Sequence, residues 1–226
     1  MKIMLRPVIA ISIILAAALS LDAQSRPVVV EDWSRQPAGK TGIPEGWQGQ
    51  NWGSPKYDFR IVTESPKQVL HLRSQNEGST ISKEIKVDLR EFPVLEWRWK
   101  VAVLPTGGDS RKKATDDQAA QLYVVFPRFP QAVRSRIIGY VWDSTAPAGT
   151  TVRSEKTGTV TYVIVRSGST GLGKWITETR NVAEDYKRIY GEDPSEPAGA
   201  VSISIDSNDT GSSAESYIGE IVFRRS

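Results

Sequence analysis

Cysteine is absent from the 226 residues, and histidine occurs once, as His71. The lack of cysteine excludes disulfides, thiol nucleophiles and thiolate metal ligands. A zinc site built from several histidines is excluded in the same way. A Ser-His-Asp triad would have to use His71, and no Gly-x-Ser-x-Gly turn accompanies it. The chemistry left to this chain is that of carboxylates, hydroxyls, amides and aromatic rings.

Long apolar runs are absent after residue 23, and the one run before it is typical of a secretory signal. Lys2 and Arg6 precede an apolar stretch over 7–21, and Ala23 is a small residue suited to cleavage. The stretch is shorter than the roughly 20 apolar residues of a membrane span. We therefore expect residues 1–23 to be a cleaved signal peptide that directs the protein to the periplasm; the alternative is an uncleaved anchor. Residues 24–226 are expected to form one domain without a membrane span.

The sequence also lacks a large excess of positive or of negative charge. Loss of Lys2, Arg6 and Asp22 with the signal would leave a net charge of about +2 from the 29 basic and 26 acidic residues of the whole chain. The charges are interspersed, which argues against a nucleic-acid partner, because such proteins carry a basic face. Nothing in the composition indicates an oligomeric state.

Alternation of apolar and polar residues dominates what is present. The clearest segment is 95–103, where Trp97 and Trp99 lie on the apolar face. Similar patterns cover 81–89, 201–206 and 217–224, the last with Tyr217 expected on the same face as Ile221. Further strands are expected at 27–32, 57–63, 68–73, 119–126, 137–143 and 160–166. This pattern predicts an all-β protein, a two-sheet antiparallel β sandwich.

One short helix is expected near residues 182–190. Asn181 and Glu184 have capping-box spacing, and Gly191 is placed to end the helix. Two stretches, 104–118 and 127–136, are expected to be long loops. Loops of this length in a compact domain are often functional, although simple surface disorder is the alternative.

Four blocks of the chain, at 95–126, 137–143, 173–194 and 202–223, resemble the bacterial family called domain of unknown function 3047. The resemblance extends over about residues 28–225. It implies an exported protein, no established activity and no catalytic residue. Gly107-Gly108-Asp109 departs from this family, which usually reads Gly-Ala-Asp there.

A weaker resemblance is to galactose-binding-like jelly rolls. It rests on Glu31-Asp32-Trp33 in the first strand and on the closing segment 217–223. It implies a sandwich of jelly-roll type, with the first and last strands as neighbours and a structural calcium beside them, near Glu31 and Glu220. Fold-level analogy of this kind does not establish a function.

Trp47 and Trp52 are the first candidates for ligand binding. Both lie in a loop rich in glycine, proline and amides, where an exposed indole would suit the apolar face of a sugar ring. The alternative is that the loop folds down and its indoles cap the sandwich. Asp116 and Asp117 are further ligand-binding candidates, and a partner such as Glu96 or Asp206 would be needed for acid–base work. Their other interpretation is that they pair with Arg111 and Lys113 and order the loop.

Asp206, Asn208 and Asp209 resemble the start of a calcium loop, because oxygen side chains precede Gly211. The twelfth position is Tyr217 rather than glutamate, so a turn is the alternative. No cofactor other than this structural calcium is expected.

The function favoured by the sequence is a non-catalytic glycan-binding module. A carbohydrate-active hydrolase or lyase that uses Asp or Glu is one alternative, and a structural partner in envelope assembly is another. An exposed aromatic beside polar groups would favour binding, two carboxylates at catalytic separation would favour hydrolysis, and a flat apolar patch would favour the structural role.

Export predicts a mature N-terminus near Gln24. Mass spectrometry of the protein purified from its host should find the chain without residues 1–23, because a signal peptidase cleaves after small residues. Recovery of intact chains that begin at Met1 in the membrane fraction would contradict export with cleavage.

Overall fold

The computed structural model describes residues 26–64 and 66–226, so the signal peptide expected at 1–23 lies outside the described residues. Within them, no helix is long and apolar enough to cross a membrane. The strands are β1 (Val28–Glu31), β2 (Gln48–Gly49), β3 (Asp58–Glu64), β4 (Lys67–Gln75), β5 (Gly78–Val87), β6 (Val94–Val103), β7 (Ala120–Phe126), β8 (Arg136–Asp143), β9 (Thr151–Arg153), β10 (Val160–Ser167), β11 (Ile176–Asn181), β12 (Ala198–Asp206) and β13 (Ser213–Arg224). The helices are η1 (Lys113–Thr115), α1 (Gln131–Arg134) and α2 (Val182–Tyr190).

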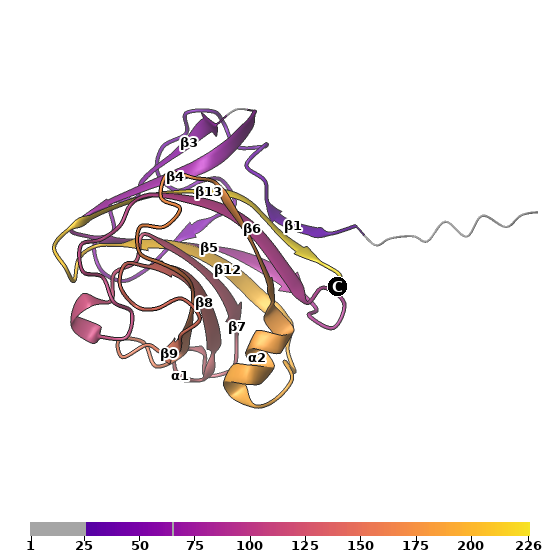
Figure 1. Ribbon diagram of the computed structural model, residues 1–226. Coiled ribbons are helices and arrows are strands. Elements are labelled where there is room, and N and C mark those ends of the chain that lie inside the picture. The colour runs from indigo at the N-terminus through magenta and orange to yellow at the C-terminus, as the bar shows by residue number, and fades with distance from the viewer. Residues whose placement is uncertain (1–25, 65) are drawn as a thin grey trace, which may run out of the picture.

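The strands form two stacked sheets (Figure 1). One sheet has the order β11-β6-β13-β4-β3, with β1 also paired to β13. The other has the order β2-β5-β12-β7-β8-β10-β9. The predicted two-sheet β sandwich of jelly-roll type is confirmed. All ladders are antiparallel except β8–β10, which is parallel; alternation alone carries no information on strand direction.

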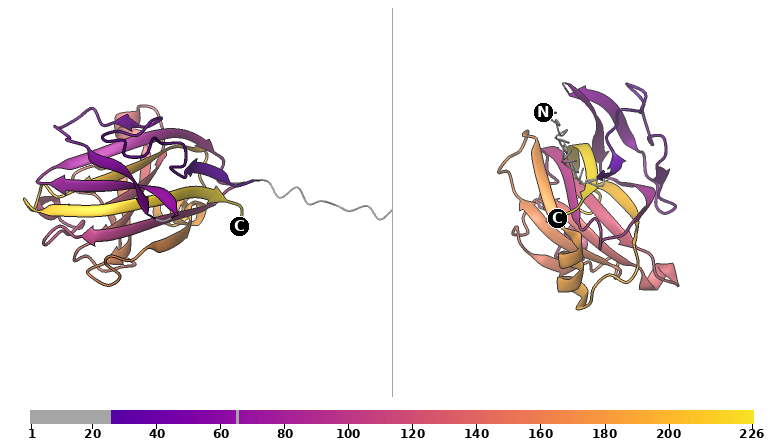
Figure 2. Two further views of the ribbon diagram at one scale, coloured as in Figure 1. Left: turned by 90° about the horizontal axis from the view of Figure 1, so that it is seen from above. Right: turned by 90° about the vertical axis from the view of Figure 1, so that its right-hand side faces the viewer.

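The first and last strands are neighbours, as expected (Figure 2). β13 is long enough to pair with β4 through residues 213–218 and with β1 through residues 221–223. The Trp33 indole, just after β1, donates a hydrogen bond to the Gly219 carbonyl at 2.8 Å. This bond fastens the chain after β1 to the middle of β13.

Large aromatic side chains fill the space between the sheets. Trp97 and Trp99 on β6 are fully buried, as predicted from the alternation. Trp97 packs against Tyr140 and Trp99 against Trp142, both on β8 of the opposite sheet, with ring centroids 5.2 and 6.0 Å apart. Because each ring buries a large apolar area, these four side chains make the central contact between the sheets.

The expected alternation in β13 is wrong at Tyr217 and Ile218, whereas Ile221 is buried as expected. The register against β6 shifts between Ile218 and Ile221, so both of these isoleucines are buried in the core although they are three residues apart. Tyr217 therefore lies on the opposite face from Ile221. Gly219 lies in this irregularity, where a Cβ atom would come within 3.2 Å of the Arg98 Cβ. A bulge of this kind bends a strand and reverses which residues face inward.

The predicted helix is confirmed as α2. The Asn181 side chain accepts a hydrogen bond from the Glu184 amide at 3.1 Å, and Gly191 ends the helix with a φ of 75°. Its buried face includes Tyr186, whose ring packs edge-on against Phe126 of β7 at 4.8 Å. Thus α2 closes one end of the sandwich (Figure 1).

Replacement of Trp97 by alanine should lower the free energy of unfolding by about 3–5 kcal/mol, as truncation of a buried large aromatic does. Urea unfolding measures the loss. Val103→Ala, at the exposed end of the same strand, is the control and should change stability by less than about 1 kcal/mol. A Trp97→Ala protein as stable as the parent would contradict the packing described here.

Candidate functional site

A pocket of about 480 Å³ lies on the outer face of the seven-stranded sheet. Its floor crosses four strands, with Thr80 from β5, Ser204 from β12, Gln121 and Tyr123 from β7, and Tyr162 from β10. Because side chains alternate along a strand, the residues between these positions point to the core. The same strands therefore provide aliphatic packing on one face and polar or aromatic groups on the other.

Gly139 on β8 makes room for the two tyrosine rings. β8 lies between β7 and β10, and a Cβ atom at Gly139 would lie 2.7 Å from Cε1 of Tyr123 and 3.1 Å from Cδ1 of Tyr162. The rings approach across this glycine, with centroids 6.4 Å apart. The Tyr123 hydroxyl also donates a hydrogen bond to the side chain of Gln121. Glycine at 139 is thus what permits the aromatic part of the pocket floor.

Trp52 borders the pocket and is 62% exposed. Its loop is tied to β5 through Gln50, whose side-chain oxygen accepts from the Thr80 amide at 2.7 Å. The Gln50 side-chain nitrogen donates to the Trp52 carbonyl at 2.9 Å. A large aromatic side chain is therefore held at the surface by a fixed backbone.

Asp116 is buried in the wall of the pocket. One carboxyl oxygen accepts a hydrogen bond from the Gln118 amide at 2.8 Å, and the other accepts from the Tyr162 hydroxyl at 3.3 Å. Burial raises the pKa of Asp116 to about 6, with the hydrogen bond from Gln118 opposing the shift. This carboxyl consequently titrates close to neutral pH.

Asp206, at the end of β12, is the second carboxyl of the pocket. Burial, and then the negative charge of Asp117, raise the pKa of Asp206 to about 8. Gly78 leaves space for this side chain, because a Cβ atom there would lie 2.9 Å from Oδ1 of Asp206. At pH 7 Asp206 is mostly protonated while Asp116 is mostly ionised.

Lys156 supplies a positive charge to the same pocket. Burial works to lower the pKa of its amine, but the contact with Asp209 and the charge of Asp206 more than offset burial, so the pKa lies above its ordinary value. The amine therefore stays charged beside the two carboxyls.

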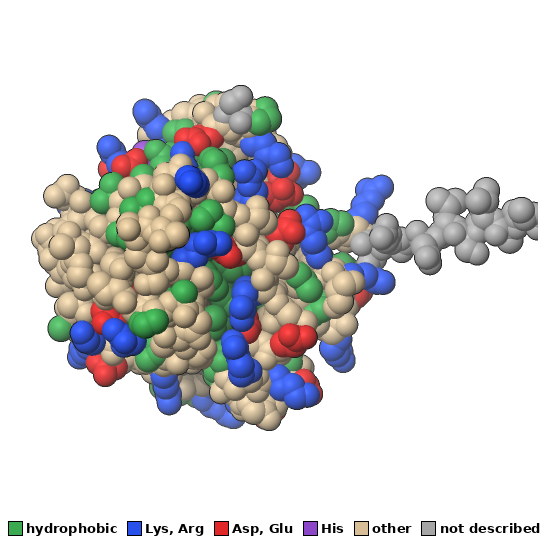
Figure 3. All heavy atoms as spheres, in the orientation of Figure 1, with side chains coloured by type: hydrophobic (Ala, Val, Ile, Leu, Met, Phe, Trp, Pro, Cys, Tyr) green, Lys and Arg blue, Asp and Glu red, His purple; other side chains and the backbone are tan. Residues whose placement is uncertain are grey.

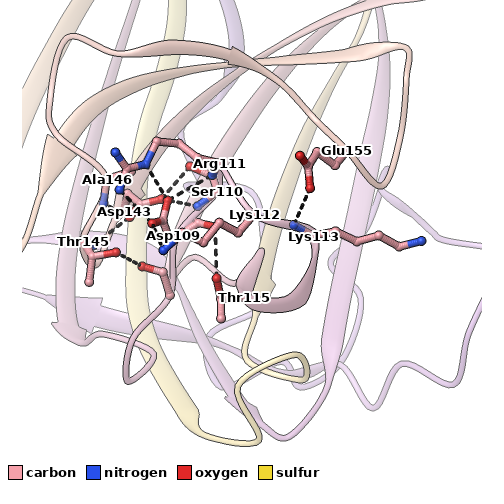
Figure 4. A network of polar contacts seen from close by, with 11 residues as sticks. Asp109, Ser110, Arg111, Lys112, Lys113, Thr115, Asp143, Thr145, Ala146 and Glu155 are labelled. Atoms are coloured by element: carbon pink, nitrogen blue, oxygen red, sulfur yellow. Dashed lines mark hydrogen bonds and ion pairs between the residues drawn. The ribbon is translucent and has the colours of Figure 1, made fainter.

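The loop that carries Asp116 is held by a buried carboxylate, Asp143, at the end of β8 (Figure 4). Asp143 accepts hydrogen bonds from the Ser110 amide at 2.8 Å and the Ser110 hydroxyl at 2.6 Å. It also accepts from the amides of Thr145 and Ala146, at 2.8 and 2.7 Å. This network orders residues 104–118, so the alternative of surface disorder does not apply to this loop.

Trp47, one of the two loop tryptophans considered for ligand binding, is buried. It is 6% exposed and stacks on Trp33 with ring centroids 5.7 Å apart. Its indole donates to the Glu31 carboxylate at 3.1 Å. The alternative interpretation therefore holds for Trp47, whose loop folds onto the sandwich, whereas Trp52 lies at the surface.

Asp117 also lies away from the pocket. It is fully buried, and its two oxygens accept from the amides of Asp209 and Thr210 at 3.1 and 2.7 Å. Its side chain thereby holds the turn after β12. The alternative pairing of this aspartate with Arg111 is not formed, because Arg111 binds Asp109 at 2.8 Å.

The three residues expected to bind calcium do not all face one point. Asp206 and Asn208 line the pocket, and Asp209 contacts Lys156. Over 26–64 and 66–226, no three or more His, Cys, Asp or Glu side chains are arranged to hold a metal ion. Calcium at this turn, or near Glu31 and Glu220, stays a prediction, to be tested by a fall of the melting temperature in EDTA.

Sequence reasoning missed Gln121, Tyr123, Tyr162, Lys156 and Gly139 as pocket residues. A signal was present in β7, where Gln121 and Tyr123 alternate with aliphatic residues and so share the outward face. Nothing local indicates that Tyr162 lies near them, because a parallel crossover joins β8 to β10.

The family model described as "Protein of unknown function (DUF3047)" matches residues 45–222. No curated protein sequence matches the chain. Among solved structures, the family 11 carbohydrate-binding module of the cellulase Lic26A-Cel5E of Clostridium thermocellum is 8% identical, with 89% of this chain and 95% of that chain covered and a TM-score of 0.47.

Two further similar structures are an enzyme domain and a binding domain. The xyloglucanase domain of NopAA from Sinorhizobium fredii is 10% identical, with 84% of this chain and 97% of that chain covered and a TM-score of 0.46. The CBM22-1 xylan-binding domain of Xyn10C from Paenibacillus barcinonensis is 13% identical, with 83% of this chain and 96% of that chain covered and a TM-score of 0.39. Likenesses this distant assign no ligand, so the ligand has to be inferred from the pocket.

The raised pKa values predict how stability depends on pH. Asp206 and Asp116 have folded pKa values of about 8 and about 6, against 3.8 for an ordinary aspartate. At pH values between 3.8 and the folded pKa of each carboxyl, the folded state binds more protons than the unfolded state. The contribution of the two carboxyls to stability therefore falls as the pH rises through this range. Asp206→Asn, which stays neutral, should lose less stability than the parent between pH 5 and pH 9.

Melting temperatures at the two pH values test this expectation. Asp193→Asn, which replaces an exposed carboxylate, is the control and should follow the parent. An Asp206→Asn protein with the parent's pH dependence would show that Asp206 is ionised throughout this range.

Proposed function

The chain belongs to the DUF3047 family of proteins of unknown function, and from its pocket we propose that it is a non-catalytic glycan-binding module. The proposal includes export to the periplasm through residues 1–23. Glycans are the ligand class because the pocket combines an exposed aromatic ring with a polar floor.

The exposed ring of Trp52 carries this proposal. A sugar ring has an apolar face of C–H groups and a rim of hydroxyls, so it stacks on a flat aromatic and hydrogen-bonds at its edge. Trp52 offers the flat surface at 62% exposure, and its loop is already fixed by Gln50. Little ordering would therefore be needed when a ligand binds.

The floor of the pocket supplies both donors and acceptors for hydroxyl groups. Ser204 and Thr80 lie side by side, with their hydroxyls 2.8 Å apart, and Gln121 presents an amide from the neighbouring strand. Asp206 in its protonated form donates a hydrogen bond, whereas ionised Asp116 accepts one. Such a mixture matches sugar hydroxyls, which both donate and accept.

Glycoside hydrolysis is the second candidate, and the two carboxyls favour it. Asp206 is mostly protonated and Asp116 mostly ionised at pH 7, so the pair holds the protonation states of a general acid and a general base. In a hydrolase, Asp206 would protonate the leaving oxygen and Asp116 would activate water or attack the sugar. Both reactions would take place on the ligand that Trp52 helps to hold.

Trp52→Ala should keep the melting temperature of the parent and weaken retention on polysaccharides by about fivefold or more, because stacking on an aromatic ring contributes about 1 kcal/mol or more. A glycan array and pull-down on insoluble polysaccharides measure binding. Phe129→Ala, which removes another exposed aromatic, is the matched control and should bind like the parent.

The same incubations distinguish the two candidates. Release of shorter sugars by the parent, lost in Asp116→Asn and in Asp206→Asn, would establish hydrolysis in place of simple binding. A parent protein that neither retains nor cleaves any glycan on a broad panel would overturn both.

A further inference from the structure

A second pocket, of about 500 Å³, lies at the end of the sandwich beside α1 and α2. Its walls come from α1, the start of β8, β9, the turn before β10 and the end of α2. It shares no lining residue with the pocket that contains Trp52. The inference drawn from it is therefore independent of the proposed glycan binding.

Arginine dominates this second pocket. Arg134, Arg136, Arg153 and Arg188 line it, and of the residues that the structure describes no aspartate or glutamate does. Figure 3 shows Lys and Arg side chains along the lower edge of the molecule, where Figure 1 places α1 and α2. Since basic and acidic residues are nearly balanced over the whole chain, this local excess of positive charge is distinctive.

Two of the arginines are neutralised within the protein and two are not. Arg136 pairs with Glu192 at 2.7 Å, and Arg188 pairs with Asp185 at 2.6 Å. Arg134 instead donates to the Phe129 carbonyl, at 3.2 Å. Arg153 likewise bonds the Gly158 carbonyl, at 2.7 Å, and within the described parts of the chain neither of the two forms an ion pair with a carboxylate. Carbonyl contacts orient a guanidinium but leave its charge uncompensated.

The floor of the pocket is ordered before any ligand arrives. The guanidinium of Arg136 lies over the Tyr190 ring at 4.5 Å and over the Tyr186 ring at 5.3 Å. The Tyr190 hydroxyl donates to the Ile137 carbonyl at 3.3 Å. Thr151 and Thr159 add hydroxyl donors to the wall. Fixed donors around uncompensated charge are suited to an oxyanion.

We propose that this pocket binds a phosphate group. A planar guanidinium presents paired N–H donors that match the oxygens of a phosphate, and two such groups here have no counter-ion among residues 26–64 and 66–226. The phosphate has two sources with the same chemistry, a soluble phosphorylated ligand or the headgroup of an anionic phospholipid. Phe129 and Val133, which are 86% and 73% exposed beside the pocket, are positioned to enter a lipid surface if the headgroup is the source.

Titration with inorganic phosphate, followed by calorimetry, tests the site itself. The double variant Arg134→Ala, Arg153→Ala should bind phosphate about tenfold more weakly or not at all, because it loses charge-assisted hydrogen bonds. Arg35→Ala with Lys174→Ala removes the same charge from exposed positions outside the pocket and should bind like the parent. Equal weakening in the two double variants, or no binding by the parent, would overturn the proposal.

Co-sedimentation with vesicles distinguishes the sources. If a lipid headgroup is bound, the parent should sediment with phosphatidylglycerol vesicles and not with phosphatidylcholine vesicles. The double variant Phe129→Ser, Val133→Ser should then stay in the supernatant with both. Binding of phosphate in solution without retention on either vesicle would identify a soluble phosphorylated ligand. Either result supports the site, and both leave the polysaccharide assay of Trp52→Ala unaffected.

Discussion

The buried carboxylate of Asp143 accepts four hydrogen bonds, and the candidate glycan pocket depends on them. A buried carboxylate is tolerated only when its oxygens are satisfied, so this site forces residues 110, 145 and 146 to converge on the end of β8. The converged loop carries Asp116 to the pocket wall. Lys113 in the same loop donates from its amide to Glu155 at 3.0 Å, which joins this loop to the one that holds Lys156.

Four aspartates, two of them adjacent in sequence, thus acquire different roles from their surroundings. Asp117 and Asp143 have their oxygens occupied by backbone donors and serve the fold. Asp116 accepts hydrogen bonds from side chains, and half-buried Asp206 accepts one from the Asn208 amide; desolvation outweighs these bonds and raises the pKa of each carboxyl. Both of these carboxyls line the pocket, where a ligand can reach them. Ionisable groups with shifted pKa values are common in clefts that bind ligands.

The elements themselves could largely be predicted, because their causes are local. The capping pair Asn181 and Glu184 specifies α2 within one turn of helix, and the alternation of residues 95–103 specifies β6 with its two buried tryptophans. Predictions were wrong, or alternatives stayed open, where a distant partner decides the outcome. The irregularity between Ile218 and Ile221 depends on pairing with β6, and the burial of Trp47 depends on the ring of Trp33 and the carboxylate of Glu31.

By itself, the sequence determined the fold class, the absence of thiol and multi-histidine chemistry, and a short set of polar and aromatic residues from which a site could be built. Only the tertiary structure decided which of them meet. Trp52, Asp116, Tyr162 and Asp206 come from segments separated by up to 154 positions and converge through sheet pairing and one parallel crossover. Burial, and with it the pKa of each carboxyl, is a property of that convergence, because desolvation depends on every neighbour in space and not on neighbours in sequence.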